Sequence, residues 1–213
     1  MNRVDFANRY SSFENDLLGR IQNVYICYSK NEKVRYHASS GGFIRELYHS
    51  LIREKIVDGV IALRHIAGMD YEPGIIKDVS EMPTSIYHNV NFSQAIQILK
   101  ENPGKFAIIG LPCQLISIDL FMETERDRTI KDRLFLKISL ICGYSFERTN
   151  FNALAAWYQI SFDTLSYRNG GRYRSFRFVG QDGTISEYSV RQPKTYWSAL
   201  VQGIAFDRFH AQK

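Results

Sequence analysis

The stretch KFAIIGLPCQ, residues 105–114, decides the fold of this chain. Its apolar run, residues 106–109, indicates a strand that is covered on both faces, as in a parallel sheet. Gly110 and Pro112 follow at once, and the residues after Cys113 have the apolar spacing of a helix. The stretch therefore places Cys113 where a buried strand ends and a helix begins.

A cysteine at this junction has two explanations. Ligands of open parallel sheets bind beyond the carboxyl ends of the strands, and a thiolate at a helix start is stabilised by free N–H groups and the helix dipole. An unpaired cysteine is also often a small buried hydrophobe. The stretch alone leaves both explanations open for Cys113.

Upstream, the pattern predicts a strand over residues 23–29, which includes Cys27, and a helix after the turn SSGG, residues 39–42. Ser39 or Ser40 would cap that helix. A buried strand follows in DGVIALR, and then a loop that contains Pro73 and Pro83.

The order of elements from Ser93 onward predicts the architecture. Ser93 caps a helix that stops at residues 102–104, and then come the strand and helix of the opening stretch and a further strand within residues 133–143. Helices that alternate with strands predict a parallel sheet with helices on its faces.

The pattern changes towards the end of the chain. A helix over residues 150–160 precedes a hairpin within residues 174–190, whose turn contains Gly183, and an amphipathic helix over residues 195–213. We therefore expect an α/β fold with a mostly parallel sheet, flanking helices and a C-terminal antiparallel hairpin plus helix.

The totals narrow the class of protein. The 213 residues are 45% apolar and 23% charged, which is typical of a globular protein. No apolar run approaches the roughly 20 residues that span a bilayer, and the charged N-terminus is not a secretory signal. Three cysteines without tight spacing indicate a reducing compartment. We expect a cytoplasmic protein without a membrane span.

The net charge of +5 is a mild basic excess, part of which lies in YRNGGRYRSFRF, residues 167–178. Arginines among aromatic residues can bind single-stranded nucleic acid, but they can equally bind cofactor phosphates or form the wet face of a strand. Because there is no second basic patch, we expect no nucleic-acid partner.

Two features point to an anionic ligand. SSGG opens a helix, where small residues let backbone N–H groups approach a phosphate, although the same residues make a tight turn. The second feature is GLPC at the carboxyl end of a strand. Cys142 ends the next predicted strand, so both cysteines are expected at one sheet edge, as metal ligands, as a redox pair or without a role. Two cysteines are too few for a zinc site or an iron–sulfur cluster, which commonly takes four.

The chain resembles the coenzyme F420 hydrogenase/dehydrogenase beta-subunit family. The runs that carry the resemblance are ASSGGFIRELYHSLIREKIVDGVI, SIYHNVNFSQAIQILKENPGKFAIIGLPCQLISI, LICGYSF and SYRNGGRYRSFRF, in this order. The resemblance implies an N-terminal extension over residues 1–37 and a flavin-binding α/β domain over residues 38–213.

The family resemblance implies a flavoprotein that binds FAD and transfers electrons, with iron–sulfur clusters, between a partner and a substrate such as coenzyme F420. Residues that would line the flavin crevice are Ser39, Ser40, Gly41, Gly42, Tyr87, Gly110, Leu111, Pro112, Cys113, Gln114 and Arg168. Cys113 and Cys142 would be cluster-associated. The partner would be a redox protein or a small electron acceptor, and a homo-oligomer is left open.

The chain departs from the family pattern in its cysteines. Residues 1–37 contain Cys27 alone where relatives carry a ferredoxin-like cysteine run, and no C-x-x-C pair follows the arginine segment. A 4Fe–4S cluster would therefore need ligands from elsewhere. The alternative reading is an inactive, truncated homologue that acts as a binding or assembly subunit. A thiol enzyme with Cys113 as nucleophile is a third reading.

Overall fold

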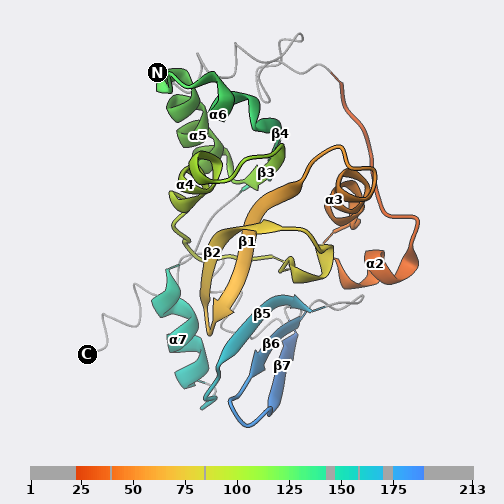
Figure 1. Ribbon diagram of the computed structural model, residues 1–213. Coiled ribbons are helices and arrows are strands. Elements are labelled where there is room, and N and C mark those ends of the chain that lie inside the picture. Colours follow the sequence, from red (N-terminus) through yellow and green to blue (C-terminus); the bar gives the residue numbers. More distant parts are fainter. Residues whose placement is uncertain are drawn as a thin grey trace.

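The computed structural model describes residues 23–38, 40–83, 85–142, 147–157, 159–169 and 175–189. These residues form a four-stranded sheet in the order β2-β1-β3-β4 and a three-stranded sheet in the order β5-β6-β7 (Figure 1). The expected α/β fold, with a mostly parallel sheet, flanking helices and an antiparallel addition, is confirmed. The helix predicted over residues 195–213 lies outside the described residues.

The first sheet is built around the apolar run of β3 (Phe106–Gly110), every residue of which is buried. On one side β3 pairs in parallel with β1 (Gly59–Ala67), and on the other with β4 (Leu134–Ser139). A strand between two parallel neighbours is covered by helices on both faces, which is why the run is apolar without alternation. The sequence prediction for this stretch is confirmed.

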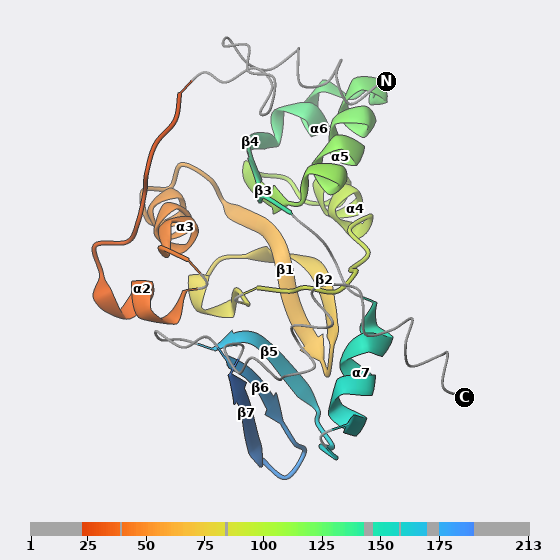
Figure 2. The same ribbon diagram turned by 180° about the vertical axis from the view of Figure 1, so that it is seen from behind.

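Helices cover both faces of this sheet. α3 (Phe43–Arg53) lies on one side, and α4 (Gln94–Glu101), α5 (Pro112–Thr124) and the short α6 (Arg128–Asp132) lie on the other (Figures 1 and 2). Successive residues of β1 point to opposite faces, so Val60 joins the cluster with Leu51 of α3, and Ile61 joins the one with Leu115 of α5.

The edge strand β2 (Asp70–Ile76) corrects one prediction. The expected loop around Pro73 is instead a strand antiparallel to β1, with Pro73 opposite Leu63. Proline has no N–H to donate, so it is tolerated on an edge strand, where one side of the backbone has no neighbour. Pro83 does follow a short 3-10 helix, η1 (Val79–Glu81), outside the strands.

The strand predicted over residues 23–29 is wrong. This segment has no strand partner in the described part of the chain, and Val24 and Ile26 are 77% and 97% exposed. It meets the rest of the fold at residues 27–29, where the Ser29 N–H donates to Gly41 O at 2.6 Å. Cys27 is therefore exposed rather than part of a core strand.

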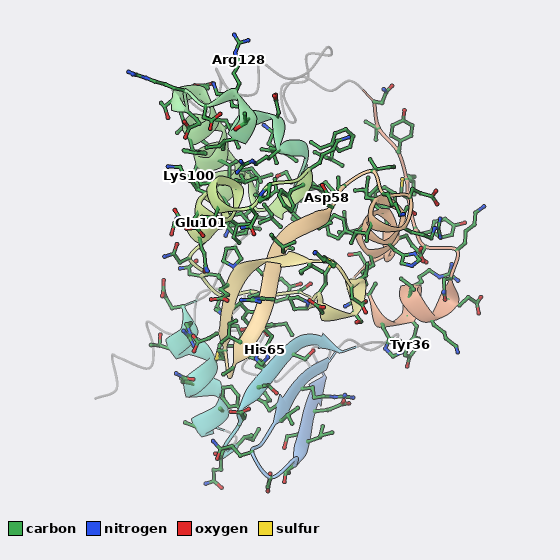
Figure 3. All side chains as sticks on the ribbon, viewed as in Figure 1. Tyr36, Asp58, His65, Lys100, Glu101 and Arg128 are labelled. Atoms are coloured by element: carbon green, nitrogen blue, oxygen red, sulfur yellow. The ribbon has the colours of Figure 1, made fainter. Side chains whose placement is uncertain are left out.

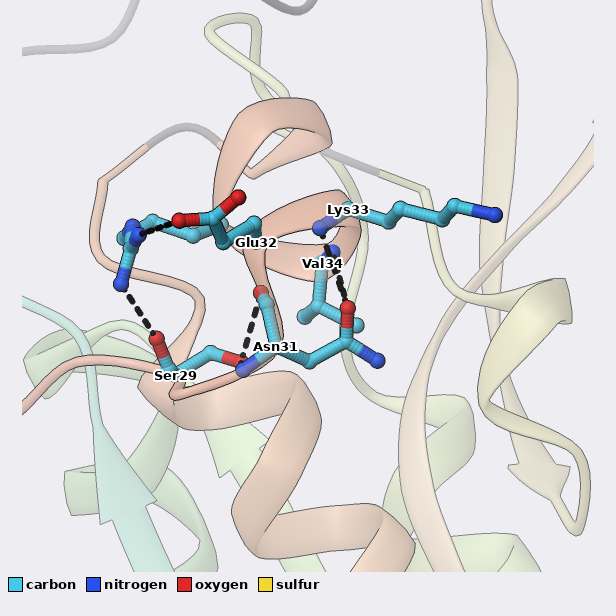
Figure 4. Close-up of polar contacts among 6 residues, drawn as sticks. Ser29, Asn31, Glu32, Lys33 and Val34 are labelled. Carbon is cyan, nitrogen blue, oxygen red and sulfur yellow. Dashed lines mark hydrogen bonds and ion pairs between the residues drawn. The ribbon is translucent and has the colours of Figure 1, made fainter.

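Figure 4 shows how the chain turns from this segment into α2 (Glu32–His37). Asn31 Oδ1 caps the helix by accepting from the N–H groups of Lys33 and Val34 at 3.0 and 3.4 Å. The buried Ser29 hydroxyl donates to Glu46 Oε1 of α3 at 2.7 Å. The bond from Ser29 to Glu46 therefore connects the turn before α2 with the first turn of α3.

One predicted helix cap is wrong, and a second is confirmed in position. The N-cap of α3 is Gly42, whose φ of 76° favours glycine, and not Ser40, while Ser39 lies outside the described residues. Ser93 is the N-cap residue of α4, as predicted, but its side chain makes no cap bond. Instead, Asn91 Oδ1 accepts from the Ser93 N–H at 2.9 Å. The predicted stop of α4 at Asn102 is confirmed.

The second sheet is an antiparallel meander of β5 (Thr164–Asn169), β6 (Ser175–Val179) and β7 (Ile185–Ser189), with α7 (Arg148–Trp157) beside it (Figure 1). The predicted hairpin and its turn at Gly183, with a φ of 80°, are confirmed, but β5 was not predicted. Met69 of the β1–β2 turn packs into the core of this unit.

No helix in the described ranges is long and apolar enough to cross a membrane.

Candidate functional site

The predicted crevice lies at the carboxyl edge of the parallel strands. β3 ends at Gly110, Leu111 is the N-cap of α5, and Pro112 and Cys113 are its first residues. Cys113 is exposed, so the explanation as a buried hydrophobe is wrong. Gln114 Oε1 accepts from the Leu111 N–H at 2.8 Å, which satisfies one backbone donor at the helix start.

Cys142 lies at the same edge, beyond the end of β4. The Leu140 N–H donates to Gly110 O at 2.9 Å, which holds the segment after β4 beside the end of β3. Cys142 is exposed like Cys113. No group of three or more His, Cys, Asp or Glu side chains in the described part of the chain could hold a metal ion. Those residues therefore do not assemble the ligands of a four-cysteine cluster.

The two ends of α3 differ in where they lie. The far end is near the amino ends of β1 and β3, where the Val57 N–H donates to Leu51 O at 3.3 Å and the Asp58 N–H donates to Lys105 O at 2.7 Å. Figure 3 shows Asp58 at the start of β1 and His65 towards its other end. Gly42, at the start of α3, is the end of that helix away from the amino edge, and the start of α5 follows directly on the carboxyl end of β3.

Gly41 and Gly42 have a packing role of their own. A Cβ on Gly41 would lie 2.9 Å from Tyr28 Cβ and 3.1 Å from Cys27 O. The SSGG turn therefore needs glycine so that residues 27–29 can pass closely over it. The sequence left two explanations of SSGG open, a tight turn and phosphate binding, and this packing corresponds to the tight turn.

The starts of α3 and α5 share an electrostatic property. Their N-cap residues, Gly42 and Leu111, make no side-chain cap bond, and neither does that of α4, whereas Asn31, Asp78 and Asp127 cap α2, η1 and α6. The first-turn N–H groups of a helix have no intrahelical acceptor, and the dipole makes that end positive. Each of these two helix starts therefore offers backbone donors to an anion.

The remaining predicted residues lie towards the second sheet. Tyr87 is half-buried against the core of the second sheet, with its ring edge-on to Tyr167 at 5.6 Å between centroids. Arg168 follows Tyr167 in β5, and its side chain lies outside the described residues. Tyr87 and Arg168 therefore belong to the unit of the second sheet, which faces the end of the β1–β2 hairpin, and not to the crevice at the carboxyl edge.

Sequence reasoning missed His88. This side chain is 5% exposed, its Nε2 lies 2.9 Å from Met69 O, and its Nδ1 contacts the Tyr167 hydroxyl. Burial is the main reason that the pKa of His88 is lowered, and the positive charge of Arg148 adds to this effect. A lone histidine without ligand spacing gave no signal, because its partners are distant in the sequence.

Two surface cavities formed by the described residues lie elsewhere. One of about 270 Å³ is lined by Gly68, Met69, Arg148, Asn152, Phe162 and Asp163. Another of about 240 Å³ lies beside Asp119 and Lys137, between α5 and β4. Neither is lined by a residue of the predicted flavin crevice.

Comparison with known proteins gives matches along most of the chain. Residues 24–97 match the N-terminal part of the family described as coenzyme F420 hydrogenase/dehydrogenase, beta subunit. Residues 104–205 match the C-terminal part of the same family. No curated protein matches the sequence.

A solved structure shares the fold. It is the F420-reducing NiFe hydrogenase complex from Methanosarcina barkeri, with a TM-score of 0.55 and 14% identity to the matching chain. The match covers 77% of this chain and 59% of that chain.

Proposed function

Because this chain belongs to the coenzyme F420 hydrogenase/dehydrogenase beta-subunit family, which implies a role in electron transfer, we propose that it is an FAD-dependent electron-transfer subunit. The observation that carries the proposal is the start of α5 at the carboxyl edge of the sheet, directly after β3, with the start of α3 as a second set of backbone donors. Open α/β sheets bind cofactors at this edge.

The residues at this edge fit the charged part of FAD. Its pyrophosphate is an anion, and the first-turn N–H groups of α3 and α5 are donors at the positive helix ends. Gly110 leaves little room of its own, since a Cβ there would lie 3.2 Å from Gln114 Oε1. The proposed contacts to the pyrophosphate are therefore backbone N–H groups, and they do not depend on open space at Gly110.

Bound FAD would supply hydride and single-electron transfer. The chain would bind its phosphates with the backbone N–H groups of residues 42–45 and of Cys113 and Gln114, and Tyr87 would limit access from the second sheet. Cys113 and Cys142 would flank the same edge as exposed thiols. A 4Fe–4S cluster does not fit the described residues alone, so no step is assigned to one.

The partner is also a proposal. The matched solved structure is a multi-subunit hydrogenase complex, which supports a redox partner protein for this chain. This chain spans 59% of the length of its counterpart there, so the substrate and the assembly of that complex are not transferred to it. We place the protein in the cytoplasm on the basis of its cysteine content.

The test is a visible spectrum and an FAD titration of the full chain purified without oxygen. We expect flavin absorption bands and saturable quenching of flavin fluorescence. A chain that stays colourless and does not retain FAD would contradict the proposal and favour the alternative, a binding or assembly subunit without catalysis.

A charge variant locates the site. Ser40 is exposed beside the start of α3, and Ser40→Glu places a negative charge near the proposed phosphates. We expect FAD binding to weaken about fivefold. Thr124→Glu is the matched control, because exposed Thr124 is the last residue of α5, at the opposite edge. If the two variants bind FAD with equal affinity, the FAD site does not lie at the start of α3.

A further inference from the structure

We infer that His88 is an acid-sensitive latch, which holds the three-stranded sheet against the β1–β2 hairpin while its ring is neutral and loosens it when the ring is protonated. The inference concerns the joint between the two sheets and does not depend on a bound flavin.

The latch joins three segments that are distant in the sequence. His88 lies between η1 and α4, Met69 lies in the turn of the β1–β2 hairpin, and Tyr167 lies in β5. His88 Nε2 is 2.9 Å from Met69 O, and Nδ1 contacts the Tyr167 hydroxyl. One side chain therefore connects the hairpin of the first sheet with the second sheet.

These contacts define the tautomer. A carbonyl oxygen can only accept, so Nε2 carries the hydrogen and donates to Met69 O. Nδ1 of the neutral ring then has a lone pair, and the Tyr167 O–H donates to it. Protonation would place an N–H on Nδ1, so the Tyr167 hydroxyl would have to turn and accept instead. The neutral ring is thus the form that fits the observed contacts.

The surroundings make a charged ring costly. His88 is 5% exposed, and Tyr167 and Phe151 are buried against it at centroid distances of 5.7 and 6.4 Å. A charged imidazolium in this aromatic cluster would lose most of its hydration. Protonation therefore favours a loosened arrangement in which water reaches the ring.

The charged and titratable groups around the ring come from three elements. β2 contributes Asp70 and Tyr71, α7 contributes Arg148, and β5 contributes Tyr167. Arg148 is paired with Asp70 at 2.7 Å, so its guanidinium opposes a positive ring while the carboxylate favours one. Burial and Arg148 prevail, and the pKa of His88 is lowered.

A surface cavity gives solvent a route towards the latch. This cavity of about 270 Å³ is lined by Met69 and Arg148, together with Phe162 and Asp163 of the segment before β5. Opening at this point would separate β5 from the hairpin turn without unfolding β3, whose strand partners are all in the first sheet. The apolar cluster around Phe151 and Leu165 would keep the second sheet attached.

Hydrogen exchange of the full chain at pH 7.5 and 5.5 tests the inference, with rates corrected for the intrinsic effect of pH. The protection of peptides from β5 (Thr164–Asn169) is expected to fall at the lower pH by up to about tenfold, the limit that linkage sets for a histidine that titrates near 6.5 in the open form and at a lower pH in the closed form. Peptides from β3 are expected to keep their protection. Equal protection of β5 at both pH values would overturn the inference.

Two variants separate His88 from general acid sensitivity. His88→Gln retains an amide that can donate to Met69 O but cannot be protonated, so β5 should lose its pH response. His65→Gln is the matched control: His65 is exposed, bonded to Gly68 O at 2.9 Å, and not part of the latch. This control should keep the same pH response as the wild-type chain. A full response in His88→Gln would refute the role of His88.

A third variant covers the case in which His88→Gln does not fold. Tyr167→Phe keeps the ring and removes the bond to Nδ1, so β5 should exchange faster already at pH 7.5. The His88 titration, followed by the NMR signal of its ring, should move to higher pH because the neutral form has lost a hydrogen bond. Unchanged exchange and an unchanged titration would overturn the latch.

Discussion

Among single residues, two buried tyrosines differ in whether the hydroxyl has a partner. The Tyr48 hydroxyl is fully buried and has no hydrogen-bond partner in the described part of the chain, whereas the Tyr167 hydroxyl contacts His88. Burial raises the pKa of both phenols, so both stay neutral. A buried hydroxyl without a partner costs free energy that a hydrogen-bonded one does not.

We expect Tyr48→Phe and Tyr167→Phe to have opposite effects on stability. Removal of the unpaired Tyr48 hydroxyl should raise the free energy of unfolding by about 1 kcal/mol, and removal of the bonded Tyr167 hydroxyl should lower it by about 1–2 kcal/mol. Urea denaturation at pH 7.5 measures both. A loss of more than about 1 kcal/mol in Tyr48→Phe would mean that this hydroxyl does have a partner.

Two glycines with positive φ allow a second comparison at this scale. Gly104 has a φ of 133°, and a Cβ there would lie 3.0 Å from Asp58 Oδ2. Gly183 has a φ of 80° and an open environment. Gly104→Ala should cost about 2–3 kcal/mol of unfolding free energy, and Gly183→Ala about 1 kcal/mol. Equal losses in thermal or urea unfolding would show that the contact with Asp58 adds nothing.

The candidate site could be predicted from sequence only where neighbours in the chain define it. Cys113 was placed correctly, because the end of a strand and the start of a helix are local patterns. His88 was missed, because its contacts with Met69 and Tyr167 arise from tertiary structure. The glycines of the SSGG turn gave an ambiguous signal, since close packing by residues 27–29 and binding of a phosphate both require a small residue.

At the scale of elements, an ion pair joins α5 to β4. Asp119 is buried with 10% of its side chain exposed, and it pairs with Lys137, whose side chain is 32% exposed. Lys137→Met should lower the free energy of unfolding by about 2 kcal/mol, because it leaves a buried carboxylate without this cation. The double variant with Asp119→Leu should recover most of the loss, and a double-mutant cycle in urea measures the coupling.

The exposed pair Arg53 and Glu54 is the control for this prediction. Its side chains are 60% and 56% exposed, and Arg53→Met should change the free energy of unfolding by less than about 0.5 kcal/mol. If Lys137→Met costs no more than Arg53→Met, the pair between α5 and β4 contributes no more than a surface contact.

The elements that the sequence predicted are those with strong periodicity. β3, α5 and β4 followed from an apolar run, a helical pattern and a second run. β2 was missed because Pro73 normally marks a loop, and only its edge position makes the residue acceptable in a strand. The segment at residues 23–29 has the composition of a strand, but strand formation also needs a neighbour with which to pair.

At the scale of the whole molecule, the buried His88 makes stability depend on pH. Its folded pKa is lowered from 6.5, so below about pH 6.5 the unfolded chain binds a proton that the native chain does not. The resulting stability is present above that pH and decreases as the pH falls. Between pH 7.5 and 5.5, wild type should lose more unfolding free energy than His88→Gln, by up to about 1 kcal/mol.

Carboxylates do not obscure this measurement. Hydrogen bonds from neighbouring threonine residues lower the pKa of Asp127 and Asp182. Their contribution is present above the unfolded value of 3.8 and is lost only as the pH falls through their lower folded values. Urea midpoints at pH 7.5 and 5.5 are therefore sensitive to His88. An equal loss in both proteins would contradict the prediction.

The position of β1 between an antiparallel and a parallel neighbour has a consequence for how the chain folds. Its pairing with β2 closes across a short turn, with Ala67 opposite Asp70, whereas its pairing with β3 brings Val60 to Ala107. Local hairpins form within microseconds, while contacts between distant residues wait for the chain to close a large loop. We expect the hairpin to assemble first and to act as the template on which the parallel strands arrive late.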